Sequence, residues 1–421
     1  MRKWQRENAP GLKNGKVPKW RPVALVALLF FSLTSGPWPL SPASVFASRL
    51  WTTGFEENNL STGTWTSITN SPTITTSNPH SGTYALLIDA AEWVSRAFSS
   101  VTSGTFYLGG YLYVNSVGAS GAARVLAAFR NSTPTTVIEL QLTTAKVLQI
   151  TNKLTGTTKT GPTLNVGQHY LVEIKYVAAD SGGSVEWRVD GVDQTAITGE
   201  DTLNTNVASF ILGGDNSGIS LSIQWDDVYF NDSNGSFQNS WRGAIGGIYM
   251  LEPNADVSVQ FTQNGGAGSN FGGVNELPGT FDDVLYNSST TTNHVDRLGL
   301  TALGSEVPSD AVIFLADVYA RIGGIATSGV RQSRVKIWDE SGTLTNGPTT
   351  SLNDINGWSL MGVADHLVYN ASGKTKSNFD SFDAGYELLT NNQAQVSALW
   401  VNVEWKPAPT AVARRRILVT P

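Results

Sequence analysis

The sequence predicts an all-β protein with more than one domain. Only 15% of its 421 residues are charged, and few windows show the helical period of Glu, Lys and Leu. Short runs of alternating apolar and polar residues, separated by turn residues, recur along most of the chain. Cysteine is absent, which excludes disulfides and thiolate zinc sites. Stability must therefore come from apolar burial and sheet hydrogen bonds, and 13 tryptophans supply much of that apolar surface.

Residues 1–47 differ in character from the rest of the chain. Several basic residues precede an apolar run at 23–33, which is too short to span a bilayer comfortably. The tripeptide Val-Phe-Ala at 45–47 is an acceptable cleavage site, so the pattern predicts a signal peptide and export. The alternative is an over-long reading frame, in which translation starts later and nothing is cleaved.

Residues 48–235 form the first predicted domain, a β-sandwich or jelly roll. Leu171, Glu173 and Lys175 alternate with apolar neighbours, and Asp190-Gly191 is the strongest hairpin signal in the chain. Regular short strands of this kind are typical of sandwiches and jelly rolls. We expect strands at 84–88, 105–114, 124–129, 137–142, 146–151, 170–177, 184–189, 209–212 and 221–230.

A polar stretch at 231–240 marks the predicted boundary with a second β-rich domain, residues 241–405. Segment 311–320 could also be helical, but its β-branched and aromatic residues favour a strand. We expect a mobile tail at 406–421, whose three arginines make a solvated charge run rather than a nucleic-acid arm. The strands expected in the second domain lie at 255–261, 311–319, 334–338, 358–361 and 395–405.

The segment SLSIQWDDVYFND at 220–232 places two adjacent carboxylates in an alternating strand. Asp227 falls on the apolar face with Trp225, where a carboxylate must be neutralised, hydrogen-bonded or bound to a cation. We interpret Asp226 and Asp227 chiefly as architecture, with a bulge that turns Asp227 to the sandwich rim to cap backbone N–H groups. The similar FDDVLYNSS at 281–289 is interpreted as coincidence or similar strand-end chemistry, not as a repeat.

A family resemblance rests on motifs that follow one another in the first domain. These are TTGFEENN, SGTYALLI, GTFYLGGYLYV, GQHYLVEIKY, VEWRVDG and IQWDDVYFND. In this order they resemble laminin-G-like, concanavalin-A-like domains. The resemblance implies a concanavalin-A-like jelly roll.

The second domain extends the resemblance to tailed-phage and prophage virion structural proteins, in which a second β region often follows a lectin-like domain. The matching residues are Trp241-Arg242-Gly243, Asp282-Asp283 with Tyr286, Arg321 after the strand at 311–320, and Trp400. The resemblance implies a homo-oligomeric virion or tail-associated protein that contacts other virion or surface-layer proteins. The signal-like N-terminus departs from this pattern.

Catalytic motifs are missing from the sequence. The strand-borne Glu-x-Asp-x-x-Glu of laminarinase-class jelly rolls does not occur, nor do the Gly-x-Ser-x-Gly elbow and the phosphate loop. No catalytic residue and no cofactor is therefore assigned, and a polysaccharide hydrolase is the less favoured alternative. The net charge of -6 is spread along the chain, which argues against nucleic acid as a partner.

Calcium is the metal that the resemblance implies, because lectin-like jelly rolls often bind it at the sandwich rim. The residues with suitable hard oxygens are Asp215, Asn216, Asp226 and Asp227. Surface glycans would need an exposed aromatic platform, for which Trp93 and Trp65 are the candidates. For both tryptophans, packing in the core is the competing interpretation.

Two hypotheses for function follow from the sequence. The preferred one is a non-enzymatic structural or adhesion protein of a virion. The alternative is a secreted, extracellular carbohydrate-binding protein of a bacterium, which the signal-like N-terminus favours.

Overall fold

The computed structural model describes residues 49–60, 64–101, 104–119, 121–203, 206–214, 216, 220–234, 237–278, 281–324, 331–352, 357–360, 366–390 and 393–408. The predicted signal-like segment at 1–47 and all of the predicted tail beyond 408 lie outside these ranges. The described residues belong to one compact unit. Within the described ranges, no helix is both long and apolar enough to cross a membrane.

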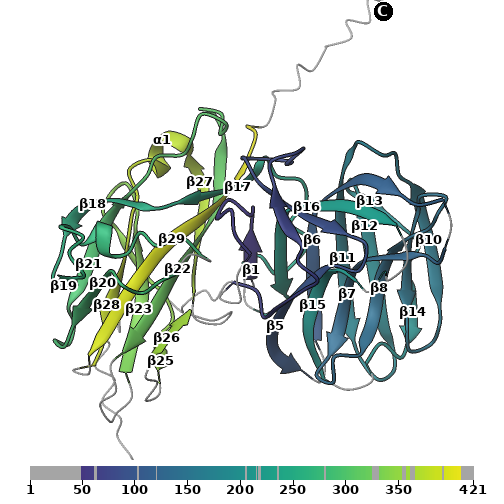
Figure 1. Ribbon diagram of the computed structural model, residues 1–421, viewed down its shortest axis with the longest axis horizontal. Coiled ribbons are helices and arrows are strands. Elements are labelled where there is room, and N and C mark those ends of the chain that lie inside the picture. Colours follow the sequence, from purple (N-terminus) through teal and green to yellow (C-terminus); the bar gives the residue numbers. More distant parts are fainter. Residues whose placement is uncertain are drawn as a thin grey trace, which may run out of the picture. The chain divides into compact units, whose positions relative to one another are not determined.

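The described strands of the first region form two antiparallel sheets, here called the first sandwich (Figure 1). The nine-stranded sheet has the order β13 (Val192–Asp193), β12 (Gly183–Val189), β11 (His169–Ala178), β6 (Gly104–Val117), β16 (Leu221–Asp232), β4 (Ala85–Asp89) and β3 (Thr73–Thr75), with β1 (Arg49–Thr53) paired to β16 and β14 (Ile197–Glu200) to β12. The seven-stranded sheet has the order β10 (Thr158–Thr163), β9 (Val147–Asn152), β8 (Thr136–Leu142), β7 (Arg124–Asn131), β15 (Val207–Gly213), β5 (Trp93–Val101) and β2 (Ser67–Thr69).

The core of the first sandwich is built by the alternation of its strands. In β12, Val185, Trp187 and Val189 are buried while the residues between them are partly exposed. Inward residues of both sheets join in one hydrophobic cluster. Large aromatic side chains dominate its centre because each removes a large apolar area from water. The fully buried rings include Trp65, Phe129, Tyr176, Phe210 and Phe230.

The strands expected in the first region are all present, and the all-β prediction is confirmed. Asp190 and Gly191 both have positive φ, at 51° and 77°, as the predicted hairpin turn requires. The sequence reasoning missed β5. In this strand Arg96 takes an inward position between Val94 and Phe98, which breaks the apolar alternation that marks a strand.

The strands of the second region form two further antiparallel sheets, here called the second sandwich (Figure 1). The seven-stranded sheet has the order β19 (Thr262–Asn264), β20 (Tyr286–Ser289), β29 (Ala394–Lys406), β22 (Val312–Gly324) and β26 (Gly357–Leu360), with β17 (Gly247–Leu251) paired to β29 and β27 (Leu367–Thr375) to β22. The six-stranded sheet has the order β18 (Pro253–Ser258), β21 (Val295–Leu300), β28 (Asp383–Leu388), β23 (Arg331–Trp338) and β24 (Leu344–Asn346), with β25 (Thr350–Leu352) paired to β23.

Segment 311–320 is part of strand β22, as its β-branched residues predicted, and it pairs with β29 and β27. Two short helical turns complete the region, η1 (Phe271–Gly273) and α1 (Lys376–Phe379). The capping box of Thr375 and Asn378 explains where α1 begins. A second hydrophobic cluster fills the space between these two sheets.

A buried ion pair joins the first strand of the first sandwich to the last strand of the second. Arg49 on β1 donates to Glu404 on β29, and both side chains are fully buried. Thr52 Oγ1 donates to the same carboxylate at 2.9 Å, and Asn402 Nδ2 donates to the Thr52 carbonyl at 3.0 Å. Arg49 Nε also donates to Asn231 Oδ1 at 2.6 Å. These five residues are called the junction.

Replacing Arg49 by Met should lower the free energy of unfolding by about 3–5 kcal/mol, because Glu404 would remain as an uncompensated buried charge. Adding Glu404→Leu to that variant should recover most of the loss, because the remaining charge is then removed as well. Urea unfolding followed by tryptophan fluorescence measures both effects.

The partly exposed pair between Lys175 and Glu186, with Nζ and Oε1 2.7 Å apart, provides the matched control. Lys175→Met should cost at most about 1 kcal/mol because solvent screens a surface pair. Equal losses for Lys175→Met and Arg49→Met would contradict the role given to the junction.

Candidate functional site

The Asp226–Asp227 pair lies at an irregularity of β16. The register between β16 and β6 shifts between Asp226 and Tyr229, and Asp227 adopts a left-handed backbone with φ of 47°. This conformation is uncommon outside glycine, and aspartate tolerates it better than most residues. The predicted bulge is therefore present. The predicted position at the sandwich rim is wrong, however, because Asp227 is completely buried.

Each carboxylate oxygen of this pair has a hydrogen-bond partner. Asp227 accepts from Ser81 Oγ at 2.9 Å, from the backbone N–H of Ile248 at 2.7 Å, and lies 2.6 Å from Nδ1 of His80. Asp226 accepts from the backbone N–H groups of His80, Ser81 and Asp227 at 2.7–3.1 Å. Burial and the neighbouring Asp227 charge raise the pKa of Asp226 well above its ordinary value. These five residues are called the Asp227 cluster.

The outer face of β6, β11 and β16 is covered by the chain's own segment 241–248. Tyr111 Oη donates to the Ile245 carbonyl at 3.1 Å, and the Gly243 N–H donates to Glu173 at 2.9 Å. Glu173 also accepts from Tyr229 Oη at 2.6 Å. Tyr229 lies against Gly109, where an added Cβ would stand 2.4 Å from the ring. Part of this sheet face is therefore occupied by intramolecular contacts.

Arg242 completes the polar surroundings of the Asp227 cluster. Its Nη2 donates to the Asp227 carbonyl at 2.8 Å, and its guanidinium lies 4.3 Å from the centre of the Tyr229 ring. Burial lowers the pKa of Arg242, while the Tyr229, Asp227 and Glu173 groups oppose that shift. The Trp-Arg-Gly motif thus supplies a side chain that ties segment 241–248 to β16.

The predicted calcium ligands are not assembled among the described residues. Asn216 forms both of its side-chain hydrogen bonds with the backbone of Val125, at 2.8 and 3.0 Å. Asp226 and Asp227 bond to the donors of the Asp227 cluster instead, and Asp215 lies outside the described residues. No group of three or more His, Asp or Glu side chains suited to a metal ion occurs in the described part of the chain.

The segment FDDVLYNSS at 281–289 contains the second Asp-Asp motif. Of the two interpretations of its similarity to the first motif, the structure agrees with similar chemistry at the end of a strand. Asp283 also has a left-handed backbone, with φ of 57°. Its two carboxylate oxygens accept from Arg321 Nε and Nη2, each at 2.7 Å, and Ser397 Oγ donates to one of them at 2.8 Å. Arg321 also lies over the Phe281 ring, which contacts Trp400. Asp283, Arg321 and Trp400, noted separately in the sequence, thus meet in one cluster.

Trp65 cannot serve as the predicted glycan platform. Its side chain has no exposed surface and packs against Trp51, Phe55 and Phe210 in the core. The prediction is wrong because inward packing removes a larger apolar area from water than a surface position would. Trp93 is partly exposed, and the Arg130 guanidinium lies 4.4 Å from the centre of its ring.

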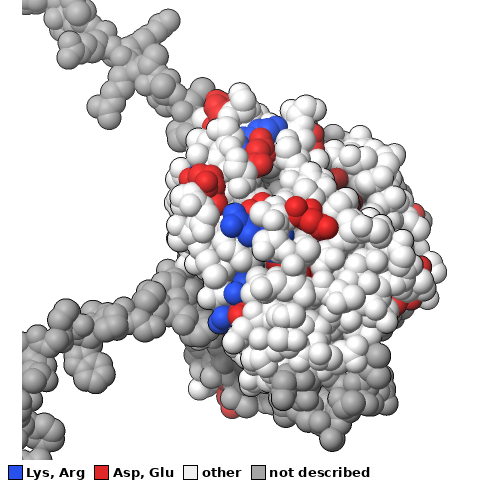
Figure 2. Space-filling model, turned by 90° about the vertical axis from the view of Figure 1, so that its left-hand side faces the viewer, with Lys and Arg blue, Asp and Glu red and all other residues white. Residues whose placement is uncertain are grey.

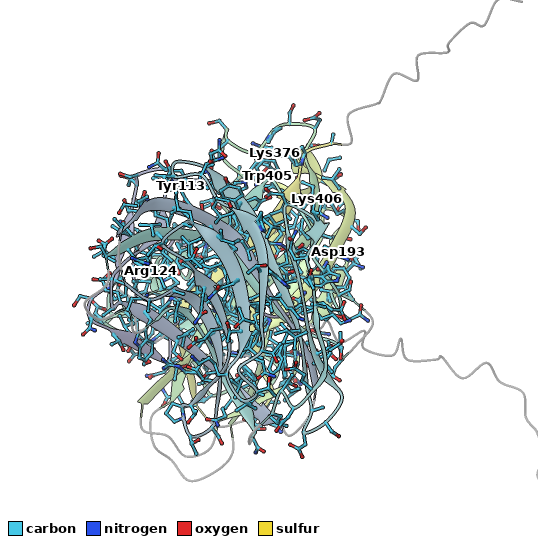
Figure 3. The ribbon with its side chains drawn as sticks, turned by 90° about the vertical axis from the view of Figure 1, so that its right-hand side faces the viewer. Tyr113, Arg124, Asp193, Lys376, Trp405 and Lys406 are labelled. Carbon is cyan, nitrogen blue, oxygen red and sulfur yellow. The ribbon has the colours of Figure 1, made fainter. Side chains whose placement is uncertain are left out.

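A surface aromatic that the glycan prediction missed is Trp241. It is partly exposed between Tyr107, whose ring centre is 5.5 Å away, and Arg188, whose guanidinium is 4.5 Å from the ring. Arg188 is held in turn by Asp193 of the exposed β12–β13 hairpin, labelled in Figure 3. The sequence marked Trp241 by its position directly after a polar boundary and by the Trp-Arg-Gly motif, but neither signal connected it with Tyr107 or Arg188.

An open groove of about 310 Å³ lies on the second sandwich and is lined by hydroxyl, amide and imidazole groups. Ser289 Oγ lies 2.9 Å from His294 Nδ1 and accepts from the Thr291 N–H at 3.1 Å. Gln260 Oε1 accepts from the Val295 N–H at 2.7 Å. Figure 2, which looks onto this sandwich, shows acidic and basic side chains gathered over one part of the face and a wide area without charged side chains beside them. The groove of about 310 Å³ is called the hydroxyl groove; its lining includes Gln260, Thr262, Ser288, Ser289, Thr291 and His294.

A smaller cavity of about 20 Å³, partly open to solvent, lies between residues of both sandwiches. It has room for one or two water-sized groups. Glu57 lines it, and burial raises the pKa of Glu57 to about 7 despite a hydroxyl contact from Thr53. We call it the Arg96 cavity; its lining includes Thr53, Glu57, Thr64, Arg96, Tyr319 and Trp400.

The fold and these contacts define a β-sandwich protein. No protein-family model matches the chain, and no curated protein matches it. Among solved structures, the chain is similar to the cellulose induced protein Cip1, with 12% identity, a TM-score of 0.36, and coverage of 46% of this chain and 99% of Cip1.

Further similar structures are an alginate lyase from Corynebacterium sp. and a Trypanosoma rangeli sialidase in complex with sialic acid. The lyase has 15% identity, a TM-score of 0.30, and coverage of 39% of this chain and 82% of the lyase. The sialidase has 12% identity and a TM-score of 0.29, and the match covers 38% of this chain and 27% of the sialidase. The activities in these names belong to those proteins.

Replacing Asp227 by Ala should lower the free energy of unfolding by about 3–5 kcal/mol, because Ser81 Oγ and the buried N–H of Ile248 lose their acceptor and Ala is strained in a left-handed backbone. Asp227→Asn should cost less, because Asn keeps one acceptor oxygen and tolerates this backbone.

Chelation with EDTA should leave the melting temperature of the parent unchanged. A fall of several degrees that added Ca²⁺ reverses would instead support the calcium prediction.

Replacing Glu57 by Gln should change how stability depends on pH. The folded-state pKa of about 7 lies above the ordinary 4.5, so Glu57 favours the folded state below pH 4.5 and this contribution is lost as the pH rises through 7. Gln stays neutral, so Glu57→Gln should be more stable than the parent at pH 8, by up to about 3 kcal/mol, and similar at pH 4.5. Urea unfolding at both pH values measures this, with Glu186→Gln at a partly exposed glutamate as control.

Proposed function

We propose that this protein is a non-enzymatic structural and adhesion component of a virion, with a lectin-like first sandwich. The observation that carries the proposal is the covered face of the nine-stranded sheet. Tyr111, Glu173 and Asp227 on this face bond to the chain's own segment 241–248. These polar groups therefore hold two sandwiches together, which suits a load-bearing or assembling protein better than an enzyme.

The carboxylates of this face also support a non-catalytic role. A glycosidase needs two carboxylates that flank the scissile bond, one of them free to give up or accept a proton. Here Asp226 and Asp227 accept from donors of the Asp227 cluster, and Glu173 accepts from Tyr229 and Gly243. Segment 241–248 supplies a donor to both Asp227 and Glu173, so a substrate would have to compete with it for these two carboxylates.

The hydroxyl groove supports the adhesion part of the proposal. Its volume of about 310 Å³ lies at the lower end of the range for small-molecule sites. Ser289, Thr291, His294 and Gln260 can exchange hydrogen bonds with the hydroxyl groups of a neutral glycan. Trp93 remains a proposed second contact on the first sandwich.

The alternative is a secreted bacterial carbohydrate-binding protein, and the same groove together with the signal-like N-terminus favours it. Both hypotheses allow glycan binding, so binding alone does not separate them. The compartment and the first residue of the mature chain do separate them.

If the protein is a virion component, mass spectrometry of particles purified from the producing culture should find it at a stoichiometry comparable to other structural proteins. Peptide mapping should show no cleavage after Ala47. Recovery of the chain only from particle-free medium, beginning at Ser48, would overturn the virion assignment and support the secreted one. Release of reducing ends from laminarin, lost in a Glu173→Gln variant, would overturn the non-enzymatic assignment.

A further inference from the structure

Arg96 places a guanidinium on the inner face of β5, where the strand pattern calls for an apolar side chain. The neighbouring inward residues, Val94 and Phe98, pack into the core of the first sandwich, and Arg96 is only 8% exposed. The guanidinium donates through Nη1 to the carbonyl of Thr64, whereas its buried Nε has no hydrogen-bond partner among the described residues. A buried donor without an acceptor costs roughly 1–3 kcal/mol, and more when the group is charged.

The charge of Arg96 is also uncompensated. None of the ion pairs formed by described residues includes Arg96. The ionisable group that acts on it electrostatically is the phenol of Tyr319, which is itself buried and has a pKa raised well above its ordinary value. Tyr319 is therefore neutral at physiological pH. A buried cation without an anion is costly, so the site favours a negatively charged occupant.

The Arg96 cavity provides the space for such an occupant. Arg96 lines it together with the aromatic rings of Trp51, Tyr319 and Trp400, which keep the surroundings apolar and so strengthen an ionic hydrogen bond. Thr64 and Asn402 add polar groups at its wall. With about 20 Å³ of space, the cavity holds one or two oxygen-sized atoms and excludes a whole sugar ring.

We propose that the Arg96 cavity is a binding site for a carboxylate group. A guanidinium binds a carboxylate through two parallel hydrogen bonds, and Thr64 occupies one terminal nitrogen of Arg96. Two carboxylate oxygens match the size of the cavity, whereas a phosphate brings four. The carboxylate belongs either to a small free acid or to a larger acidic molecule whose remainder stays outside.

Glu57 makes this site sensitive to pH. Its carboxyl group lines the same cavity and is protonated in the folded protein below about pH 7. A neutral Glu57 tolerates an incoming carboxylate and can donate to it, while an ionised Glu57 repels it. Binding of the carboxylate should therefore weaken as the pH rises through 7. The proposal is independent of whether the protein is virion-borne or secreted.

Isothermal titration calorimetry of the full chain with sodium acetate and with sodium D-glucuronate, at constant ionic strength and pH 6, tests the proposal. We expect both carboxylates to bind the parent. Affinity should fall about tenfold or more in Arg96→Lys, which keeps a positive charge but lacks the planar pair of donors. Arg188→Met removes a partly exposed arginine that does not line the cavity and should bind like the parent. No binding of either carboxylate to the parent, or undiminished affinity in Arg96→Lys, overturns the proposal.

Two further comparisons complete the experiment. Tighter binding of glucuronate than of acetate, with none of D-glucose, identifies a carboxylate carried by a larger molecule, whereas equal affinities identify a free small acid. In the parent, affinity should drop between pH 6 and pH 8, and in Glu57→Gln it should not. A drop of the same size in Glu57→Gln overturns the assignment of the carboxylate to this cavity. A thermal melt of each variant confirms that it is folded.

Discussion

The buried ion pair of Arg49 and Glu404 is the interaction on which the association of the two sandwiches depends. Both charges have left water completely, so each is tolerated only while the other is in place. Thr52, Asn231 and Asn402 satisfy the remaining polar atoms around the pair. The neighbouring Asp227 cluster adds a carboxylate that receives the N–H of Ile248. Apolar contact alone would allow the two sandwiches many relative positions, whereas these directional bonds select one.

The all-β fold could be predicted from the sequence because its signals are local. Alternation within β11 and the turn pair Asp190-Gly191 act over a few residues, and both are found in the structure. Arg96 marks the limit of such reasoning. One charged residue in an inward position hid strand β5, although that irregularity was itself the signal of a special site.

The candidate sites could be predicted only in part, because their members come together over long distances in the chain. The sequence showed that Asp227 breaks the alternation of its strand, and a bulge is present there. It did not show that His80, Ser81 and Ile248 would supply the donors, since no local pattern connects them with Asp227. Trp65 failed as a platform for a related reason: alternation locates a strand but does not say how deeply a nearby loop residue is buried.

The sequence separation across the junction has a consequence for how the chain is made. Arg49 and Glu404 are 355 positions apart, so a ribosome completes nearly all of the described chain before they can pair. Until then Arg49 in the first sandwich lacks its final partner, Glu404. Contacts of such high sequence separation form slowly, and domains whose surfaces await a late partner are vulnerable to misassembly and proteolysis. The junction therefore forms only after strand β29 has been synthesised, because Glu404 lies on that strand.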